Sequence, residues 1–288
     1  MLRKRIIAVL LVRSGRVVQS IGFNRYLPVG KPKIALEFLN QWGVDEIVYH
    51  DIEATSNASR PASTLHAVAG KCFVPLTYGG GLTKTEDMVQ AIRDGADKLS
   101  VNTAAYSNPE LIEKGAEILG NQCIIASIDF HKDKSGNRIA YSHSGKKKQS
   151  VDLVRWAREM ESRGAGEIMI NSIDRDGSKS GYDLDALESV ATNVNVPVIC
   201  CGGVGTVEHF AEGFEHGAAA CAAANFFHFT EHSVNLTKAF LERRNSEVRL
   251  ETSANYRKNH LGEDGRLLRK SDDDLENLRF KQIREEVI

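Results

Sequence analysis

The second half of the sequence repeats the first, and this duplication restricts the possible folds more than any other feature. The segment VPLTYGGGLTKTEDMVQAIRDGADKLSVNTAA (74–105) matches VPVICCGGVGTVEHFAEGFEHGAAACAAANFF (196–227) at an offset of 122 residues. Upstream, Glu46 aligns with Glu167, and the run RIIAVLLV aligns with CIIASIDF at an offset of 118 residues. We therefore expect a fold built from two equivalent halves.

Each half contains four short β-branched runs that alternate with helical patterns. The predicted strands are 5–12, 45–51, 73–78, 97–101, 123–129, 167–173, 196–200 and 219–224. Segments between them, such as 32–43, 85–95, 109–120 and 151–164, have helical periodicity and end in glycine. Near-continuous apolar strands favour a closed (β/α)8 TIM barrel of two duplicated half-barrels, with an open doubly wound sheet as the alternative.

The predicted domains are the barrel, residues 1–245, and a charged C-terminal extension, residues 246–288, outside the duplication. Ser271 followed by three aspartates predicts the start of a helix over about 272–286. The extension is interpreted either as a solvated, lightly docked tail or as a docking helix for a partner.

Charge and hydropathy exclude several classes of function. The formal net charge of -1 does not suggest a nucleic-acid partner, and no apolar run approaches the roughly 18 residues that a membrane span needs. The apolar run near the N-terminus covers only 6–12, which favours a buried first strand over a signal peptide. Five cysteines without a C-x-x-C pair indicate a reduced, cytoplasmic protein with buried thiols.

Glycine-rich loops follow equivalent strands of the two halves, at the end of a barrel where ligands bind. Backbone N–H groups of glycine loops and helix entrances can hold phosphate, although either loop alone could be a tight turn. Two equivalent copies predict one phosphate site per half-barrel and a ligand with a phosphate at each end. The candidate residues are Gly80, Gly81, Asn102 and Thr103 in the first half, and Gly202, Gly203, Ala224 and Asn225 in the second.

Several motifs together give the chain a family resemblance over about residues 1–245. KRIIAVLLVRSGRVVQ, YGGGL, ADKLSVNTAA, SIDRDGSKSGYD (172–183) and CGGVGT resemble the cyclase subunit of imidazole glycerol phosphate synthase. The resemblance implies a cytoplasmic barrel that docks a glutaminase at its N-terminal face and channels ammonia to a two-phosphate ribotide. It also implies a substrate loop that contains Asp174, Asp176, Gly177 and Ser178.

The sequence departs from this family at a position that matters for proton transfer. The resemblance implies two catalytic aspartates, at the ends of the first and fifth strands; Asp129 is present, but Leu11 occupies the other position. The repeat independently pairs Leu11 with Asp129, and Gln19 stands where the family's first loop carries lysine. Leucine cannot transfer a proton, so we expect impaired cyclisation. Asp129 either keeps a chemical or ligand role or is a structural carboxylate.

Four charged residues lie at the opposite ends of the predicted strands. Arg5, Glu46, Lys98 and Glu167 could pair as a closed ring inside the barrel bottom, because unpaired buried charges would be costly. Taken without the family they are ordinary strand-end charges; the resemblance implies that they form the entry gate for ammonia.

The leading hypothesis is a diverged relative that docks a glutaminase and conducts ammonia, but no longer runs the cyclisation of histidine biosynthesis. By the resemblance, such relatives occur in surface-polysaccharide (lipopolysaccharide) biosynthesis and feed a third protein that amidates a sugar; residues 250–288 would suit its docking. The alternative is a genuine cyclase subunit. A sugar isomerase on a related barrel would need two aspartates, and a scaffold that regulates the glutaminase is the non-enzymatic option. No cofactor is expected, and the histidines show no metal-ligand spacing.

Overall fold

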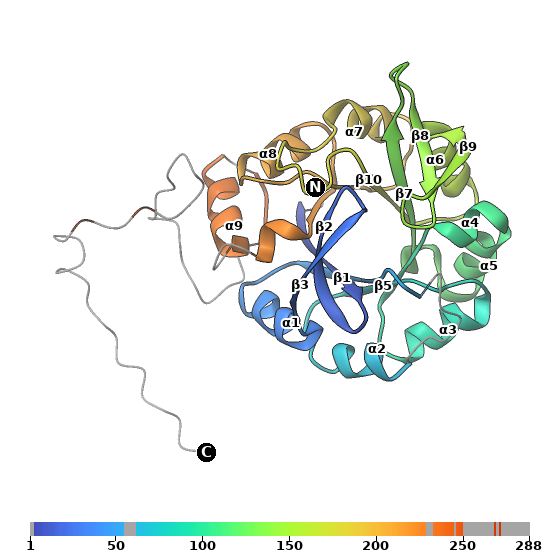
Figure 1. Ribbon diagram of the computed structural model, residues 1–288, viewed down its shortest axis with the longest axis horizontal. Helices are drawn as coiled ribbons and strands as arrows, with labels where there is room; N and C mark the ends of the chain where they lie inside the picture. The colour runs from blue at the N-terminus through green and yellow to red at the C-terminus, as the bar shows by residue number, and fades with distance from the viewer. Residues whose placement is uncertain are drawn as a thin grey trace.

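The computed structural model describes residues 3–54, 62–228, 233–244, 246–249, 268 and 271. Within them the chain forms the predicted TIM barrel, with helices around a ring of strands (Figure 1). The barrel strands are β1 (Arg5–Arg13), β4 (Glu46–Asp51), β5 (Leu76–Gly79), β6 (Lys98–Val101), β7 (Ile124–Lys132), β10 (Glu167–Ser172), β11 (Val198–Cys201) and β12 (Ala220–Ala223).

The eight barrel strands pair in parallel and the last pairs with the first. β10 joins β7 and β11, and β12 joins β11 and β1, so no open edge remains among these strands. This closure confirms the barrel and excludes the open doubly wound sheet. The eight strand segments expected from the sequence match these strands to within a few residues.

Helices follow the barrel strands and cover their outer surface (Figure 1). Two of them begin at an aspartate that accepts a backbone N–H: Asp152 from Arg155, and Asp183 from Ala186. The helices are α1 (Pro32–Gln41), α2 (Ala62–Ala69), α3 (Thr85–Arg93), α4 (Thr103–Ser107), α5 (Glu110–Leu119), α6 (Leu153–Ser162), α7 (Leu184–Ala191), α8 (Glu208–Glu215) and α9 (Ser233–Arg243), with short 3-10 turns η1 (Asn121–Cys123) and η2 (Asn225–His228).

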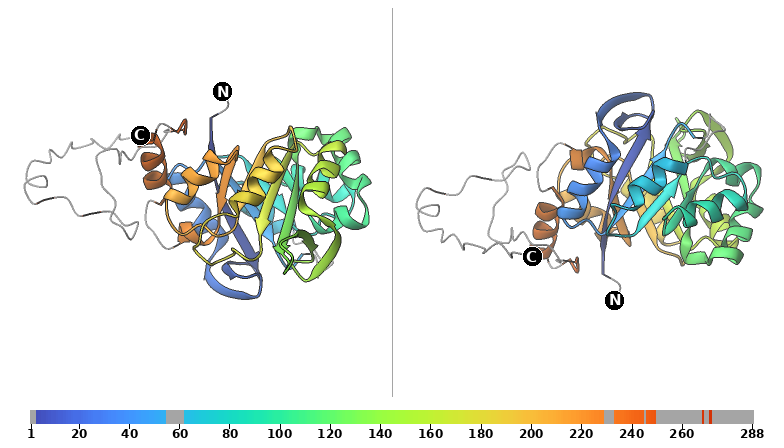
Figure 2. Two further views of the ribbon diagram at one scale, coloured as in Figure 1. Left: turned by 90° about the horizontal axis from the view of Figure 1, so that it is seen from above. Right: turned by 90° about the horizontal axis from the view of Figure 1, so that it is seen from below.

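Each half also carries a β-hairpin that the sequence did not lead us to expect. β2 (Arg16–Ile21) and β3 (Arg25–Gly30) follow β1, and β8 (Arg138–Ser142) and β9 (Lys147–Asp152) follow β7. Both extend the first strand of their half in antiparallel fashion, so the duplication holds here too. The β2–β3 hairpin projects from the end of the barrel opposite the N-terminus (Figure 2).

Alternation along the strands divides the core into two layers. On β1, Ile6, Ala8 and Leu10 pack outward against the helices, whereas Ile7 and Val9 point into the barrel. The inner layer contains Ile7, Val9, Val48, Ile125, Met169, Ile199, Cys201, Ala220 and Ala222. The barrel interior is therefore a mainly aliphatic column between its two ends, to which Thr77, Ser100 and Ser127 add buried hydroxyl groups.

The C-terminal extension begins close to the N-terminal end of β1. The Lys4 backbone N–H donates to the Glu247 carbonyl at 2.9 Å, and Lys4 pairs with Val248 in a parallel bridge. The helix expected over 272–286 lies outside the described residues, and the domain boundary at 245 stays a prediction.

Candidate active site at the barrel mouth

Two adjacent cavities lie at the C-terminal ends of the barrel strands, which we call the mouth. The first, about 330 Å³, belongs mainly to the first half-barrel, and the second, about 210 Å³, to the second half. Leu11, Phe23 and Asn171 line both, so the two cavities meet at the centre of the mouth. This is the arrangement expected for one elongated ligand that is held at both ends.

The glycine loop of the first half lines the first cavity. Gly80 and Gly81 have positive φ angles of 124° and 65°. A Cβ on Gly80 would lie 2.4 Å from the Asp51 carbonyl oxygen, so only glycine lets the two backbones approach this closely. Asn102 and Thr103 line the same cavity, where Thr103 begins α4. All four candidates of this half are thus brought together.

The second cavity repeats this construction in the second half. Gly202 and Gly203 have φ angles of 92° and 102°, and they line the cavity with Ala224 and Asn225. Asn225 begins η2, in the place that Thr103 has in the first half. Lys179 also lines this cavity and adds a cation beside it.

Substituting Gly203 tests how far the loop depends on glycine. A Cβ there would lie 2.1 Å from the Gly181 carbonyl oxygen, at a φ of 102° that other residues rarely adopt. We expect Gly203→Ala to lower the free energy of unfolding by about 1–3 kcal/mol, the usual strain for such a backbone. Gly30→Ala is the control, because no atom lies within 4 Å of its added Cβ. Equal unfolding midpoints for both variants in urea would contradict the expectation.

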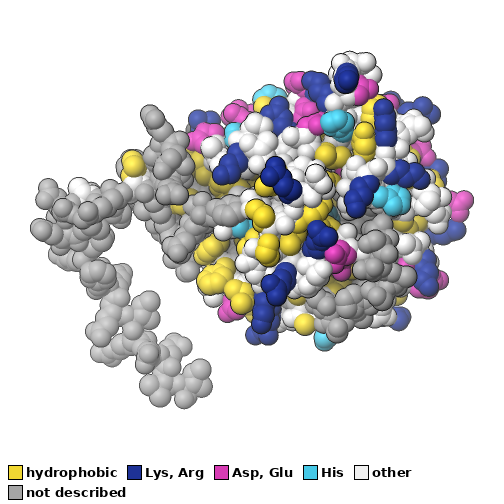
Figure 3. All heavy atoms as spheres, viewed as in Figure 1, with side chains coloured by type: hydrophobic (Ala, Val, Ile, Leu, Met, Phe, Trp, Pro, Cys, Tyr) yellow, Lys and Arg dark blue, Asp and Glu magenta, His cyan; other side chains and the backbone are white. Residues whose placement is uncertain are grey.

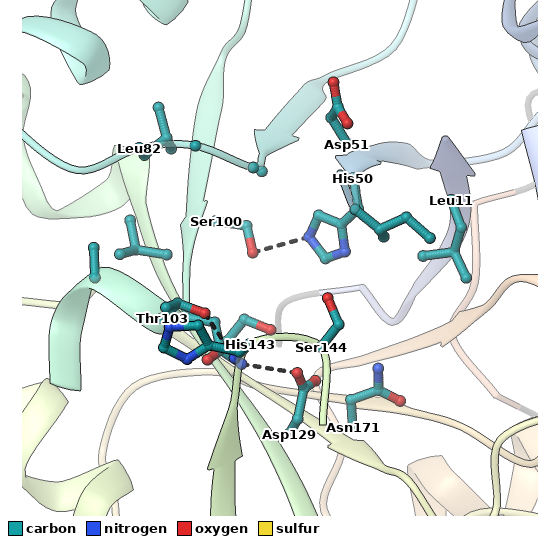
Figure 4. Close-up of a pocket in the computed structure, with 18 of the residues that line it drawn as sticks. Leu11, His50, Asp51, Leu82, Ser100, Thr103, Asp129, His143, Ser144 and Asn171 are labelled. Atoms are coloured by element: carbon teal, nitrogen blue, oxygen red, sulfur yellow. Dashed lines mark hydrogen bonds between the residues drawn. The ribbon is translucent and has the colours of Figure 1, made fainter. Parts of the chain in front are cut away.

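Asp129 and Leu11 occupy equivalent places at the mouth, as the repeat predicts. In each half, this residue is the first on its strand to pair with the hairpin that follows. Leu11 pairs with Val18, and Asp129 pairs with Tyr141. Asp129 is buried, and its carboxylate accepts a hydrogen bond from Asn102 Nδ2 at 2.9 Å (Figure 4). Leu11 presents an aliphatic side chain to both cavities.

The environment of Asp129 favours its protonated form. Burial raises the pKa of this carboxyl to about 7, and the charge of Asp176 adds to the effect, while hydrogen bonds from Asn171 and Asn102 oppose it. At neutral pH Asp129 is therefore present both with and without its proton, which is the state that a proton donor or acceptor requires.

The raised pKa of Asp129 predicts how stability depends on pH. The pKa of Asp129 is about 7 in the folded protein, above its ordinary value of 3.8. The contribution of Asp129 to the free energy of unfolding is therefore complete below pH 3.8 and is lost as the pH rises through 7. Asp129→Asn, which mimics the protonated form, should exceed the native chain in free energy of unfolding at pH 8.5 by about 4 kcal/mol, since the pKa is raised from 3.8 to about 7 and each pKa unit corresponds to about 1.36 kcal/mol. Urea unfolding should show this advantage shrinking toward pH 4.5; a difference independent of pH would contradict it.

The candidate substrate loop after β10 is only partly directed at the mouth. Asp176 and Gly177 line the second cavity. Asp174 instead pairs with the His131 imidazole and accepts the Lys132 backbone N–H at 2.8 Å. Ser178 is exposed and shares a 2.7 Å hydrogen bond with the Ser180 hydroxyl. Neither Asp174 nor Ser178 lines either cavity.

The β2–β3 hairpin is fastened across the second cavity by two polar side chains. Asp176 accepts the Ser20 hydroxyl at 2.6 Å and the Phe23 backbone N–H at 3.0 Å. Asn225 donates to the Ser20 carbonyl at 2.7 Å and accepts its N–H at 3.2 Å. The β8–β9 hairpin makes the equivalent contact in the first cavity, where the His143 N–H donates to the Thr103 hydroxyl at 3.0 Å.

The mouth face of the molecule carries basic side chains around the β2–β3 hairpin. Figure 3 shows hydrophobic side chains and Lys or Arg side chains near its centre. Arg16 and Arg25 are exposed on the hairpin, and Leu27 and Val29 are exposed beside them. A positive surface beside the cavities attracts anionic ligands such as phosphate esters.

Four charged side chains form a closed ring at the other end of the barrel. Each is the first residue of its strand: Arg5, Glu46, Lys98 and Glu167. Arg5 bonds Glu46 at 2.7 Å and Glu167 at 2.8 Å, and Lys98 bonds the same two carboxylates at 3.2 and 2.6 Å. Burial raises the pKa of Glu167, but its bonds to Arg5 and Lys98 outweigh this and lower it. The four side chains of the ring are largely buried at the end of the barrel opposite the mouth.

One residue that lines the mouth, His50, was not among the site residues predicted from the sequence. His50, at the end of β4, lines the first cavity and forms a 3.0 Å hydrogen bond with the Ser100 hydroxyl (Figure 4). The histidines of the sequence have no metal-ligand spacing, so this position carries no motif of its own. The repeat, which aligns His50 with Asn171 at an offset of 121 residues, was the available signal.

Among the described residues, no three His, Cys, Asp or Glu side chains are grouped as a metal site would need. None of the described helices is both long enough and apolar enough to cross a bilayer. The five cysteines are free thiols, and Cys200, Cys201 and Cys221 are buried.

Comparisons with known proteins agree with the geometry of the barrel. Residues 5–233 match the family model described as histidine biosynthesis protein. The chain is 41% identical to the putative imidazole glycerol phosphate synthase subunit hisF2 of Vibrio vulnificus over 258 residues, 89% of this chain and 94% of the relative. It is 43% identical to the imidazole glycerol phosphate synthase subunit HisF of Clostridium botulinum over 254 residues, 87% of this chain and all of the relative. The chain therefore belongs to the histidine biosynthesis protein family and, within it, is similar to HisF over most of its length.

Proposed function

We propose that this chain is a synthase subunit that docks a glutaminase at the N-terminal face of the barrel and conducts ammonia to the mouth. Its own cyclisation step is impaired, and the ammonia passes to a third protein that amidates a sugar in surface-polysaccharide biosynthesis. The observation that carries this proposal is Leu11, an aliphatic side chain in the place equivalent to Asp129 and in contact with both cavities.

The lower half of the barrel supports the conduit. The ring of Arg5, Glu46, Lys98 and Glu167 stands at the entrance, and its gating role follows from the resemblance to the cyclase family. Above it the mainly aliphatic column contains small residues such as Ala220 and Ala222. Neutral ammonia can pass an apolar column, whereas an ammonium ion would have to lose its hydration.

The mouth supports retention of a two-phosphate ligand. Each cavity contains a glycine loop with positive φ angles and the start of a short helix or turn, and the shared residues make the cavities continuous. Backbone N–H groups at such loops bind phosphate oxygens. The ligand can therefore bind while the proton transfer that its cyclisation needs is slowed.

The proposal is tested with the purified complex of this chain and its glutaminase, supplied with glutamine and the two-phosphate ribotide. We expect the chain to stimulate glutamine hydrolysis at least tenfold, with ammonia released into solution and imidazole formed about 10²–10⁴ times more slowly than glutamate. Imidazole formed in step with glutamate would overturn the proposed impairment. Glutaminase stimulation without ammonia release would favour the regulatory scaffold.

A genuine cyclase subunit is the second candidate, and Asp129 favours it. This carboxyl is buried at the mouth with a pKa near 7 and bonded to Asn102, as a retained proton-transfer group would be. The same assay separates the two candidates. A sugar isomerase that needs two aspartates is disfavoured, because Leu11 occupies the second position.

The identity of the acceptor protein is tested through the extension. A chain without residues 250–288 should keep the stimulation of glutaminase but lose co-purification with the sugar-modifying protein. Equal recovery of that protein with and without these residues would remove the docking role from the extension. Loss of glutaminase stimulation as well would show that the extension serves the glutaminase or the barrel.

A further inference from the structure

His50 and Leu11 are neighbours at the mouth. They pair in register between β4 and β1, as Asn171 and Asp129 do between β10 and β7. In the second half the titratable side chain is on the first strand and the neutral one is beside it. In the first half this order is reversed: the neutral Leu11 is on the first strand and the titratable His50 is beside it. Each half therefore presents one titratable side chain at this pair of register positions.

The space for the His50 imidazole is provided by Gly79 on the next strand. A Cβ on Gly79 would lie 2.5 Å from the imidazole Cδ2, so a side chain there would collide with the ring. The repeat aligns Gly79 with Cys201, which is next to the smaller Asn171. The strands of the first half thus accommodate a large titratable group where those of the second accommodate an amide.

The imidazole and the Asp129 carboxyl belong to the same cavity. His50 points inward with one ring nitrogen on Ser100, and Asp129 enters from the other half (Figure 4). The other titratable side chains that line this cavity are Tyr26, Asp51 and His143. Asp51 is occupied as an acceptor for the backbone N–H groups of Glu53 and Ala54, and the His143 ring bonds Ser142. His50 on β4 and Asp129 on β7 thus line the same cavity from opposite halves, with β5 and β6 between their strands.

We infer that His50 is the second proton-transfer group of the mouth, in place of the carboxyl that Leu11 does not supply. The inference rests on the proposed function, in which ammonia reaches a phosphate-ester ligand held at the mouth. It deepens that function by assigning the residual ring formation to His50 and Asp129 together.

The protonation states of the two groups suit opposite roles. Burial lowers the pKa of His50 to about 4 and raises that of Asp129 to about 7. At pH 6 to 7 the imidazole is therefore neutral and able to accept a proton, while a large share of Asp129 retains one. Two titratable groups whose pKa values are pushed apart in this way form an acid and base pair.

The lone pair of ammonia forms a bond to a carbonyl carbon of the ligand, and the π electrons of that carbonyl move to its oxygen. The oxygen takes the proton of Asp129, and the new C–NH3⁺ group gives a proton to His50. One proton thus passes from Asp129 to His50 through the ligand, and solvent returns the pair to its starting state.

The test uses ammonium chloride and the two-phosphate ribotide with the full chain, so that the result does not depend on glutaminase docking. We expect His50→Asn, which keeps a hydrogen-bonding group near Ser100 but cannot take up a proton, to lower residual imidazole formation by about 10²-fold. His66→Asn, on the exposed surface of α2, is the matched control and should change the rate less than about 2-fold. In the Leu11→Asp background, His50→Asn should cost less than about 3-fold, because the aspartate restores a proton-transfer group.

Two further readouts separate proton transfer from a structural role. Thermal unfolding, and its shift with inorganic phosphate, should be the same for His50→Asn and the native chain. The native kcat/KM should fall above pH 7 as Asp129 loses its proton, with the same profile at lower amplitude in His50→Asn. An unchanged rate in His50→Asn, an equal loss in the Leu11→Asp background, or no detectable imidazole from the native chain would each overturn the inference. The last result would leave the proposed conduit intact, because that is measured by ammonia release.

Discussion

Leu11→Asp is expected to raise imidazole formation from the ribotide by up to about 10²-fold, because one positioned acid or base contributes about 10²–10⁴-fold and the inferred role of His50 already supplies about 10²-fold of this. Leu11 has the same place on β1 that Asp129 has on β7, and it lines the central part of the mouth that both cavities share. The new carboxyl would therefore face the ligand from the side opposite Asp129. Stopped assays with saturating ribotide and ammonium chloride measure the gain directly.

The control for this gain is Leu11→Asn, which has nearly the same shape and polarity but no titratable group. It should leave the rate within about 3-fold of the native value, since only a group that exchanges a proton gives the larger effect. An equal gain in both variants would mean that Leu11 blocks the ligand by its bulk. A well-folded Leu11→Asp chain without any gain would show that more than one step of the cyclisation is lost.

Arg5→Met is expected to lower the free energy of unfolding by about 3–5 kcal/mol, the usual cost of removing one partner from a buried ion pair. Arg5 binds both Glu46 and Glu167, so its loss leaves two buried carboxylates with Lys98 as their remaining partner in the ring. Methionine keeps most of the aliphatic volume, which confines the change to charge and hydrogen bonding. Urea unfolding at pH 7 measures the difference.

Arg13→Met is the matched control, because Arg13 lies on the same strand and pairs with Glu53 at 3.1 Å at the surface. The Arg13 side chain is 49% exposed, against 16% for Arg5, and exposed pairs contribute about 0–1 kcal/mol. A cost for Arg5→Met as small as that of Arg13→Met would show that the ring is hydrated. In that case the barrel bottom would not separate the column from solvent.

The architecture was accessible from the sequence because the duplication imposes the same pattern twice. A single glycine loop such as 79–81 has several explanations, but its repetition at 201–203 fixes both the strand order and the placement of the two loops. The same reasoning identified Leu11, since the repeat aligns it with Asp129 in the sequence alone. When a pattern repeats at a constant offset, an error in interpreting one segment does not change the fold that is predicted from both copies.

The parts that the sequence left open depend on tertiary contacts. The hairpins were not expected because segments 13–30 and 132–152 are short, polar and rich in turns, and only their antiparallel pairing with β1 and β7 defines them as strands. Asp174 and Asp176 are alike in sequence, but the turn after β10 directs one to the end of β7 and the other to the mouth. His50 was missed because its role depends on the space above Gly79, which no local pattern reveals.

The fastening of the two hairpins makes each half-barrel depend on the other. Thr103 belongs to the first half but is held by His143 of the second, and Asn225 belongs to the second half but is held by Ser20 of the first. Each half thus orients a candidate anion-binding side chain of the other half. A half-barrel on its own would lack the hydrogen bond that orients its Thr103 or Asn225 side chain. If these residues bind an anion as proposed, a complete site needs two halves, whether joined in one chain or associated as separate copies.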